Sequence, residues 1–159
     1  MKWILILILM TPVILSFNVQ SSDEALKIKL STQLKETMDV ATHDAAIQVD
    51  QEELEQGRVS FTEAAERVFR ESIERSNRLN PEWQPMGNST WKDPIELVLF
   101  DRVESGSFPR LYNSGPPYYY MDVLQGPSVV AVVKVKHPRY YGLSDDFEYI
   151  VGSSHEYVE

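Results

Sequence analysis

Residues 13–50 read VILSFNVQSSDEALKIKLSTQLKETMDVATHDAAIQVD and contain neither proline nor glycine. In the second half of this stretch the apolar residues recur every three or four positions, at Leu26, Leu30, Leu34, Met38, Ala41, Ala45 and Val49. This is the period of one face of an α-helix. Because no helix-breaking residue interrupts the stretch, it predicts a single helix of about 55 Å, at 1.5 Å per residue, with a packing stripe along one side.

An uncharged apolar segment precedes the stripe. It has 17 residues, from Trp3 to Val19, and about 17 is the short limit for a membrane-spanning helix. Its large apolar side chains belong to Trp3, Ile4, Leu5, Ile6, Leu7, Ile8, Leu9, Val13, Ile14, Leu15 and Phe17. Lys2 before the segment and Asp23-Glu24 after it predict an N-terminus inside the cell and a C-terminus outside.

The same segment also fits a cleaved signal peptide, with Val19 and Ser21 at positions −3 and −1 of a cut after Ser21. Retention is favoured because nothing ends the helix between the apolar segment and the stripe. We therefore predict a transmembrane anchor or signal segment in residues 1–21 and an extracytoplasmic domain in residues 22–159. The protein would be a single-pass protein of the cell membrane, or a secreted one if cleavage occurs near Ser21.

The rest of the chain predicts a second helix and then a sheet. An acidic stretch ends at a turn at Gly57, and Ser60 and Glu63 have the spacing of a capping box that opens a helix reaching about Leu79. Extended segments follow at residues 95–100, with a continuation to 104, at 111–112 with 118–123, at 129–136 and at 147–158. A turn is expected at residues 140–144, and a bulge or a sheet edge at 152–154. The fold class is α+β, with a C-terminal antiparallel meander of three to four strands.

Composition argues against several classes of function. The 159 residues include no cysteine, which excludes a disulfide, a thiol nucleophile and a cysteine-based zinc site. A net charge of −9 argues against nucleic-acid binding. Since the phosphate-binding, zinc-protease and nucleophile-elbow motifs are also missing, we predict a protein that is not an enzyme, with no catalytic residue and no cofactor.

The histidines and acidic residues do not predict a metal site. Asp39 and His43 lie one helical turn apart and could hold a metal between them, but a charged surface helix produces such pairs by chance. Ser153-Ser154-His155-Glu156 contains the residue types of a catalytic triad. Neighbours along a strand point to opposite faces, however, so they cannot form a relay.

Tyrosines form the most unusual local feature. Tyr118-Tyr119-Tyr120 lies near Tyr112, and exposed tyrosines favour interfaces because each combines a rigid apolar face with a hydroxyl group. In a strand, Tyr119 would face away from Tyr118 and Tyr120. We favour packing for these residues, and hold a contact patch of Tyr112, Tyr118 and Tyr120 as the alternative. That patch would make the chain a secreted module that binds a peptide, a glycan or a wall polymer.

A membrane segment continuous with a long amphipathic helix that ends in Ala41-Thr-His-Asp-Ala-Ala46, followed by an antiparallel sheet, resembles a pilin or pseudopilin. More narrowly, the arrangement is similar to the TadE-type minor pilin-like proteins of Gram-positive bacteria. The resemblance implies a structural or assembly subunit of a surface filament or export machine, with its own copies or other pilin-like subunits as partners. The chain departs from the pilin pattern because its first glycine is Gly57 and Glu24 lies after the apolar segment.

Overall fold

The computed structural model describes residues 2–138 and 147–158. Within them the chain forms three helices and five strands: α1 (Lys2–Ala46), α2 (Gln51–Glu55), α3 (Ala64–Asn77), β1 (Glu96–Val103), β2 (Arg110–Asn113), β3 (Met121–Leu124), β4 (Ser128–Lys136) and β5 (Glu148–Glu156). The α+β class and the long N-terminal helix are confirmed. The turn expected at residues 140–144 lies outside the described residues.

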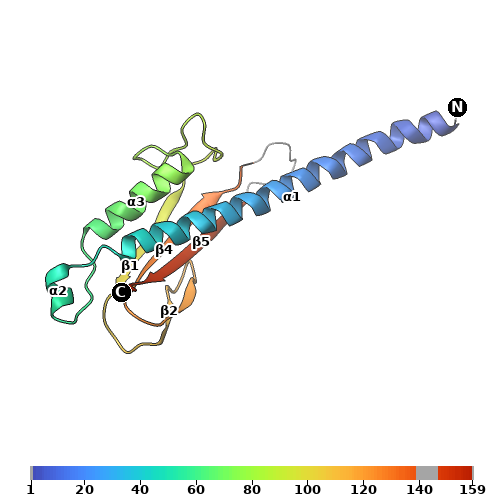
Figure 1. Ribbon diagram of the computed structural model, residues 1–159. Helices are drawn as coiled ribbons and strands as arrows, with labels where there is room; N and C mark the ends of the chain where they lie inside the picture. The colour runs from blue at the N-terminus through green and yellow to red at the C-terminus, as the bar shows by residue number, and fades with distance from the viewer. Residues whose placement is uncertain (1, 139–146, 159) are drawn as a thin grey trace.

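Helix α1 is a single element of 45 residues that includes Pro12. Its N-terminal half projects away from the rest of the molecule, whereas its C-terminal half lies along the sheet (Figure 1). The predicted continuity from the apolar segment into the amphipathic stretch is therefore confirmed. One helix therefore forms both the projecting N-terminal half, called the arm below, and a core helix of the domain.

Three antiparallel strands in the order β1-β4-β5 form the main sheet, and β2 pairs with β3 in a separate two-stranded sheet. Every residue of β4 is buried except Lys134 and Lys136, which are half-buried. Strand β4 is buried on both sides because α1 and α3 cover one face of the main sheet and the β2–β3 hairpin packs against the other (Figure 1). The domain thus has three layers.

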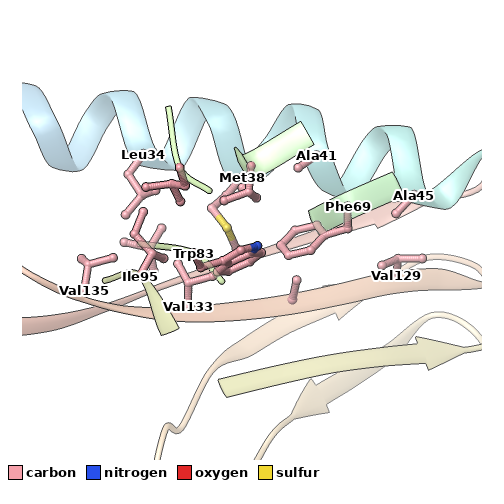
Figure 2. Packing of buried hydrophobic residues seen from close by; sticks show 14 of the residues in the cluster. Leu34, Met38, Ala41, Ala45, Phe69, Trp83, Ile95, Val129, Val133 and Val135 are labelled. Atoms are coloured by element: carbon pink, nitrogen blue, oxygen red, sulfur yellow. The ribbon is translucent and has the colours of Figure 1, made fainter. Parts of the chain in front are cut away.

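The main core lies between the helices and the sheet. Leu34, Met38 and Ala41 of α1 point toward Phe69 of α3 and toward Val133 of β4 (Figure 2). Trp83 and Ile95, from the chain between α3 and β1, complete this layer. The second, smaller cluster joins Val103, Val130 and Leu124 beneath the hairpin.

The predicted capping box at Ser60–Glu63 is wrong. Residue Glu63 is the N-cap of α3, but its side chain makes no capping hydrogen bond. Ser60 does not cap the helix because its carbonyl accepts the N–H of Asp50, and Phe61 forms a β-bridge with Val49. The extended backbone over these residues delays the helix until Ala64. At the other end, α3 stops at Asn77 because Arg78 adopts the left-handed conformation, with φ of 56°.

The predicted strands match the observed ones except in one segment. Strand β1 spans Glu96–Val103, and its irregularity between Leu97 and Leu99 is the bulge of the sheet. Of the two alternatives expected at residues 152–154, the sheet edge is confirmed, because β5 is an edge strand that keeps an unbroken register with β4. Residues 118–120 are not a strand: Tyr119 has a positive φ of 50°, and the segment is the turn that joins β2 to β3.

Candidate functional site

The projecting part of α1 carries an exposed apolar surface. Between Ile6 and Ala46 the helix contains a window long and apolar enough to cross a membrane, and none of that window is buried in the protein. Trp3 is 81% exposed and Phe17 is 70% exposed. The same surface includes Ile4, Ile6, Leu7, Ile8, Leu9, Val13, Ile14 and Leu15. The side chain of Leu5 lies outside the described part of the structure.

The residues of the predicted stripe lie in the domain's own core. Leu30, Leu34, Met38, Ala41, Ala45 and Val49 are buried, and Leu26 packs against them at the edge. The change from exposed to buried occurs at Leu30, the first residue of α1 that belongs to the core. Beyond that point the apolar face of α1 is covered by α3 and the sheet.

A polar seam joins the other side of α1 to β5. The Nζ atom of Lys35 donates to the Gly152 carbonyl at 3.0 Å, and the hydroxyls of Thr42 and Ser153 lie 3.0 Å apart. The Ser153 hydroxyl also donates to Asp39. These bonds hold α1 parallel to β5, so that residues advance along both elements in the same direction.

The seam ends at two histidines. His43 Nδ1 and His155 Nε2 are 2.8 Å apart, and the two rings are perpendicular with centroids 4.5 Å apart. Burial, followed by the proximity of His43, lowers the pKa of His155 below its ordinary value of 6.5. In the sequence His43 lies one helical turn from Asp39, whereas in the structure its ring contacts His155, 112 residues later in the chain.

The residues that resemble a triad are separated, as the alternation of a strand predicts. Ser153 faces α1 and bonds Asp39, whereas Ser154 faces the hairpin and donates to Asp122. Within residues 2–138 and 147–158, no group of three or more histidine or acidic side chains is arranged to hold a metal ion.

Tyr112 and Tyr120 pack between the hairpin and the main sheet. Tyr112 is half-buried and donates to Asp101 at 2.9 Å, and burial followed by that hydrogen bond raises its pKa. Tyr120 is also half-buried and donates to Asp122 at 3.0 Å, and burial raises its pKa to about 12. Tyr118 is half-buried. The apolar side chains that the hairpin does expose belong to Leu111, Tyr119, Met121 and Val123.

Two of the hollows on the described surface of the domain include charged side chains. The first, of about 490 Å³, lies between α1 and the chain that follows α3, and Glu36 and Arg78 are its charged lining residues. The second, of about 520 Å³, lies beside the start of α3 and includes Asp50, Arg102 and Glu104. In neither lining do a serine or threonine, a histidine and an acid occur together as a nucleophilic relay would require.

No family model, no curated protein and no solved structure matches the chain. Evidence on function therefore comes from the geometry of α1 and of the domain packed against its C-terminal half.

Proposed function

We propose that the protein is a membrane-anchored, pilin-like subunit displayed outside the cytoplasmic membrane, with a structural or assembly role. One observation carries this proposal: α1 is exposed and apolar over its N-terminal half and is the core helix of a domain over its C-terminal half. This division of one helix between two environments is what a pilin-like subunit requires.

The exposed half of α1 needs an apolar environment. Burial of one large aliphatic or aromatic side chain is worth about 1.5–3 kcal/mol, and residues 3–17 present such side chains around the helix. A bilayer supplies that environment, as do neighbouring helices in an assembly. Lys2 on one side, with Asp23 and Glu24 on the other, favours insertion with the domain outside.

The position of the domain restricts how copies would assemble. Because α3 and the sheet cover the stripe from Leu30 onward, this stripe is not available to a second subunit in the folded state. Helix packing between subunits would therefore use residues 3–19, either in the bilayer or in the core of a filament. The partners would be further copies of this chain or other pilin-like subunits.

A secreted module that binds through its tyrosines has less support. The hydroxyls of Tyr112 and Tyr120 are engaged by Asp101 and Asp122, and both rings pack against the small cluster beneath the hairpin. They are thus already used in the protein's own packing.

Anchoring is tested by measuring the intact mass and the N-terminal sequence of the native protein in membrane and culture-supernatant fractions. The proposal expects a chain in the membrane fraction that still contains Trp3–Val19. A soluble chain that starts near Ser22 would contradict anchoring and would restore the secreted alternative.

Assembly is tested by cysteine cross-linking in native membranes, which the cysteine-free chain makes simple. Single cysteines replace successive residues from Leu7 to Leu15, and Gln125→Cys, in the exposed loop before β4, is the matched control. Oxidation should give cross-linked species at helical spacing along α1 and none at Gln125. A membrane-retained protein that cross-links at no position in α1 would be an anchored monomer, and the assembly role would be wrong.

A further inference from the structure

The two histidines at the end of the α1–β5 seam form a convergent pair of nitrogen atoms. His43 belongs to the last turn of α1, and His155 is the penultimate residue of β5. Their nearest ring nitrogens are 2.8 Å apart, and the rings are perpendicular. The pair lies at the surface, since His43 is exposed and His155 is half-buried. A small ion from solvent can therefore reach the point between the two rings.

We propose that His43 and His155 form a binding site for a divalent transition-metal ion of the class that prefers imidazole, such as Zn²⁺. The ligand atoms would be Nδ1 of His43 and Nε2 of His155, and water would complete the coordination shell. Neutral imidazole is a common ligand for this class of ions. The metal would take the place of the single proton that the two nitrogens share.

The geometry requires only a small adjustment. Zinc binds histidine nitrogen at about 2.0–2.1 Å, and a tetrahedral angle then separates two ligand nitrogens by about 3.3 Å. The present separation is 2.8 Å, so a small rotation of the exposed His43 ring brings the atoms to that spacing.

The seam prepares this site in two ways. The contacts from Thr42 to Ser153 and from Lys35 to Gly152 fix α1 against β5, one residue and about two helical turns before His43. Asp39 and Glu156 also interact electrostatically with His155, and their negative charge favours a cation beside it. With two protein ligands, the site would bind more weakly than a closed structural zinc site, which has four.

Such an ion would stabilise the folded protein. The two ligands lie 112 residues apart in sequence, so the unfolded chain does not bring them together. A ligand that binds the folded state alone raises stability with its concentration. The ion would thus act as a cross-link between the helix and the edge strand.

The test uses the full chain in detergent micelles, with thermal unfolding followed by circular dichroism. Zinc chloride should raise Tm steadily with the logarithm of its concentration above Kd, by about 5–10 °C at hundredfold excess over Kd. A chelator should reverse the shift, and Mg²⁺, which prefers oxygen ligands, should not produce it. Failure of Zn²⁺ to raise Tm would overturn the proposal.

Variants identify the ligands. His43→Gln and His155→Gln should each remove the zinc-dependent shift, whereas Glu156→Gln, which removes a neighbouring charge but neither imidazole, should keep it. Calorimetric titration at 20 °C, where each variant is first shown to be folded, gives a second measure, with zinc binding lost in both histidine variants. Zinc binding that persists in His155→Gln, or that depends on Glu156 and not on the histidines, would overturn the proposal. The outcome is independent of anchoring and assembly.

Discussion

The ring of Tyr120 occupies the space that a side chain at position 152 would need. A Cβ atom built on Gly152 would lie 2.2 Å from Cδ2 of Tyr120 and 2.5 Å from Cε2. Tyr120 belongs to the connection between β2 and β3, and it packs against the small cluster that joins the hairpin to the main sheet. The absence of a side chain at Gly152 therefore lets the third layer approach β5.

Gly152→Ala should destabilise the protein by about 1–3 kcal/mol, the usual cost of forcing an extra methyl into a packed site. Urea unfolding measures the change. Gly126→Ala is the matched control, because no atom lies within 4 Å of its added Cβ. In a Tyr120→Ala background the cost of Gly152→Ala should largely disappear. A similar cost in both backgrounds would show that the Tyr120 ring is not the obstacle.

The carboxylate of Asp122 should contribute to the stability of the fold in a way that is lost in acid. The hydrogen bond from Ser154 holds the pKa of Asp122 below its ordinary value of 3.8. Because the pKa is lower in the folded state than in the unfolded state, the ionised carboxylate stabilises the fold at pH values above 3.8. This stabilisation is lost as the pH falls through the pKa of the folded state.

The free energy of unfolding of Asp122→Asn, compared with that of the unaltered chain in urea at pH 7, 5 and 3, checks this contribution. The variant should have a lower free energy of unfolding than the unaltered chain at pH 7 and pH 5. The difference between the two free energies should be smaller at pH 3. Glu55→Gln, which removes a charge from the exposed surface of α2, serves as the control. A gap for Asp122→Asn that widens at pH 3 would show that the charged carboxylate does not stabilise the fold.

At the scale of the elements, the sequence predicted α1 well because its signal is local. The spacing of Leu26, Leu30, Leu34 and Met38 repeats over several turns, and no proline or glycine interrupts it after Pro12 until Gly57. Strand β4 was also found within one residue, since its run of β-branched residues is unambiguous.

Leu34→Ala tests the role of the helix as a core element. Leu34 has no exposed surface, so its truncation should cost about 2–5 kcal/mol, the usual range for a buried leucine. Val40→Ala is the matched control, because Val40 lies outside the buried face of α1 and is 55% exposed. Its effect should remain within about 0.5 kcal/mol. If chemical unfolding shows the same loss of unfolding free energy for both variants, the assignment of Leu34 to the buried face of α1 is wrong.

The two errors at this scale have different physical origins. Ser60 failed as a capping residue because a bridge between Val49 and Phe61 keeps the local backbone extended. Tyr118–Tyr120 suggested a strand by composition, but Tyr119 lies in a turn. The bridge is a contact between separate segments that overrides a local preference, whereas the turn is closed by local hydrogen bonds from the Ser114 N–H to the Tyr120 carbonyl and from the Tyr119 N–H to the Gly115 carbonyl. The pairing of His43 with His155 also depends on the register of β5 against α1, which no local pattern specifies.

For the whole molecule, the clearest feature is the division between an arm and a domain. Among the residues whose side chains the structure describes, none before Leu30 belongs to the core, and Leu26 is the first that packs against it. The arm therefore adds nothing to the packing of the domain. Sequence could predict this division from the apolar segment and the stripe, but it could not predict the three layers, because the β2–β3 hairpin covers the sheet through contacts between distant residues.

A chain that begins at Ser22 should fold as a soluble domain. Its free energy of unfolding, measured in the same detergent as that of the full chain, should agree within about 0.5 kcal/mol, because the deleted residues are exposed. Near-ultraviolet circular dichroism of the three tryptophans provides a check, with only the signal of Trp3 removed. A truncated chain without fixed tertiary structure would show that the arm is part of the folding unit.

The parallel course of α1 and β5 has a mechanical consequence. Lys27 lies over the ring of Phe147 near the start of β5, and His43 meets His155 near its end, so the two elements run side by side in one direction. A force that pulls the N-terminus of α1 away from the C-terminal end of β5 loads their contacts, and the nine-residue ladder between β5 and β4, in shear. Bonds loaded in shear must break together, whereas bonds that are peeled break one at a time. Tension between the arm and the far end of the domain is therefore resisted by the whole length of the seam.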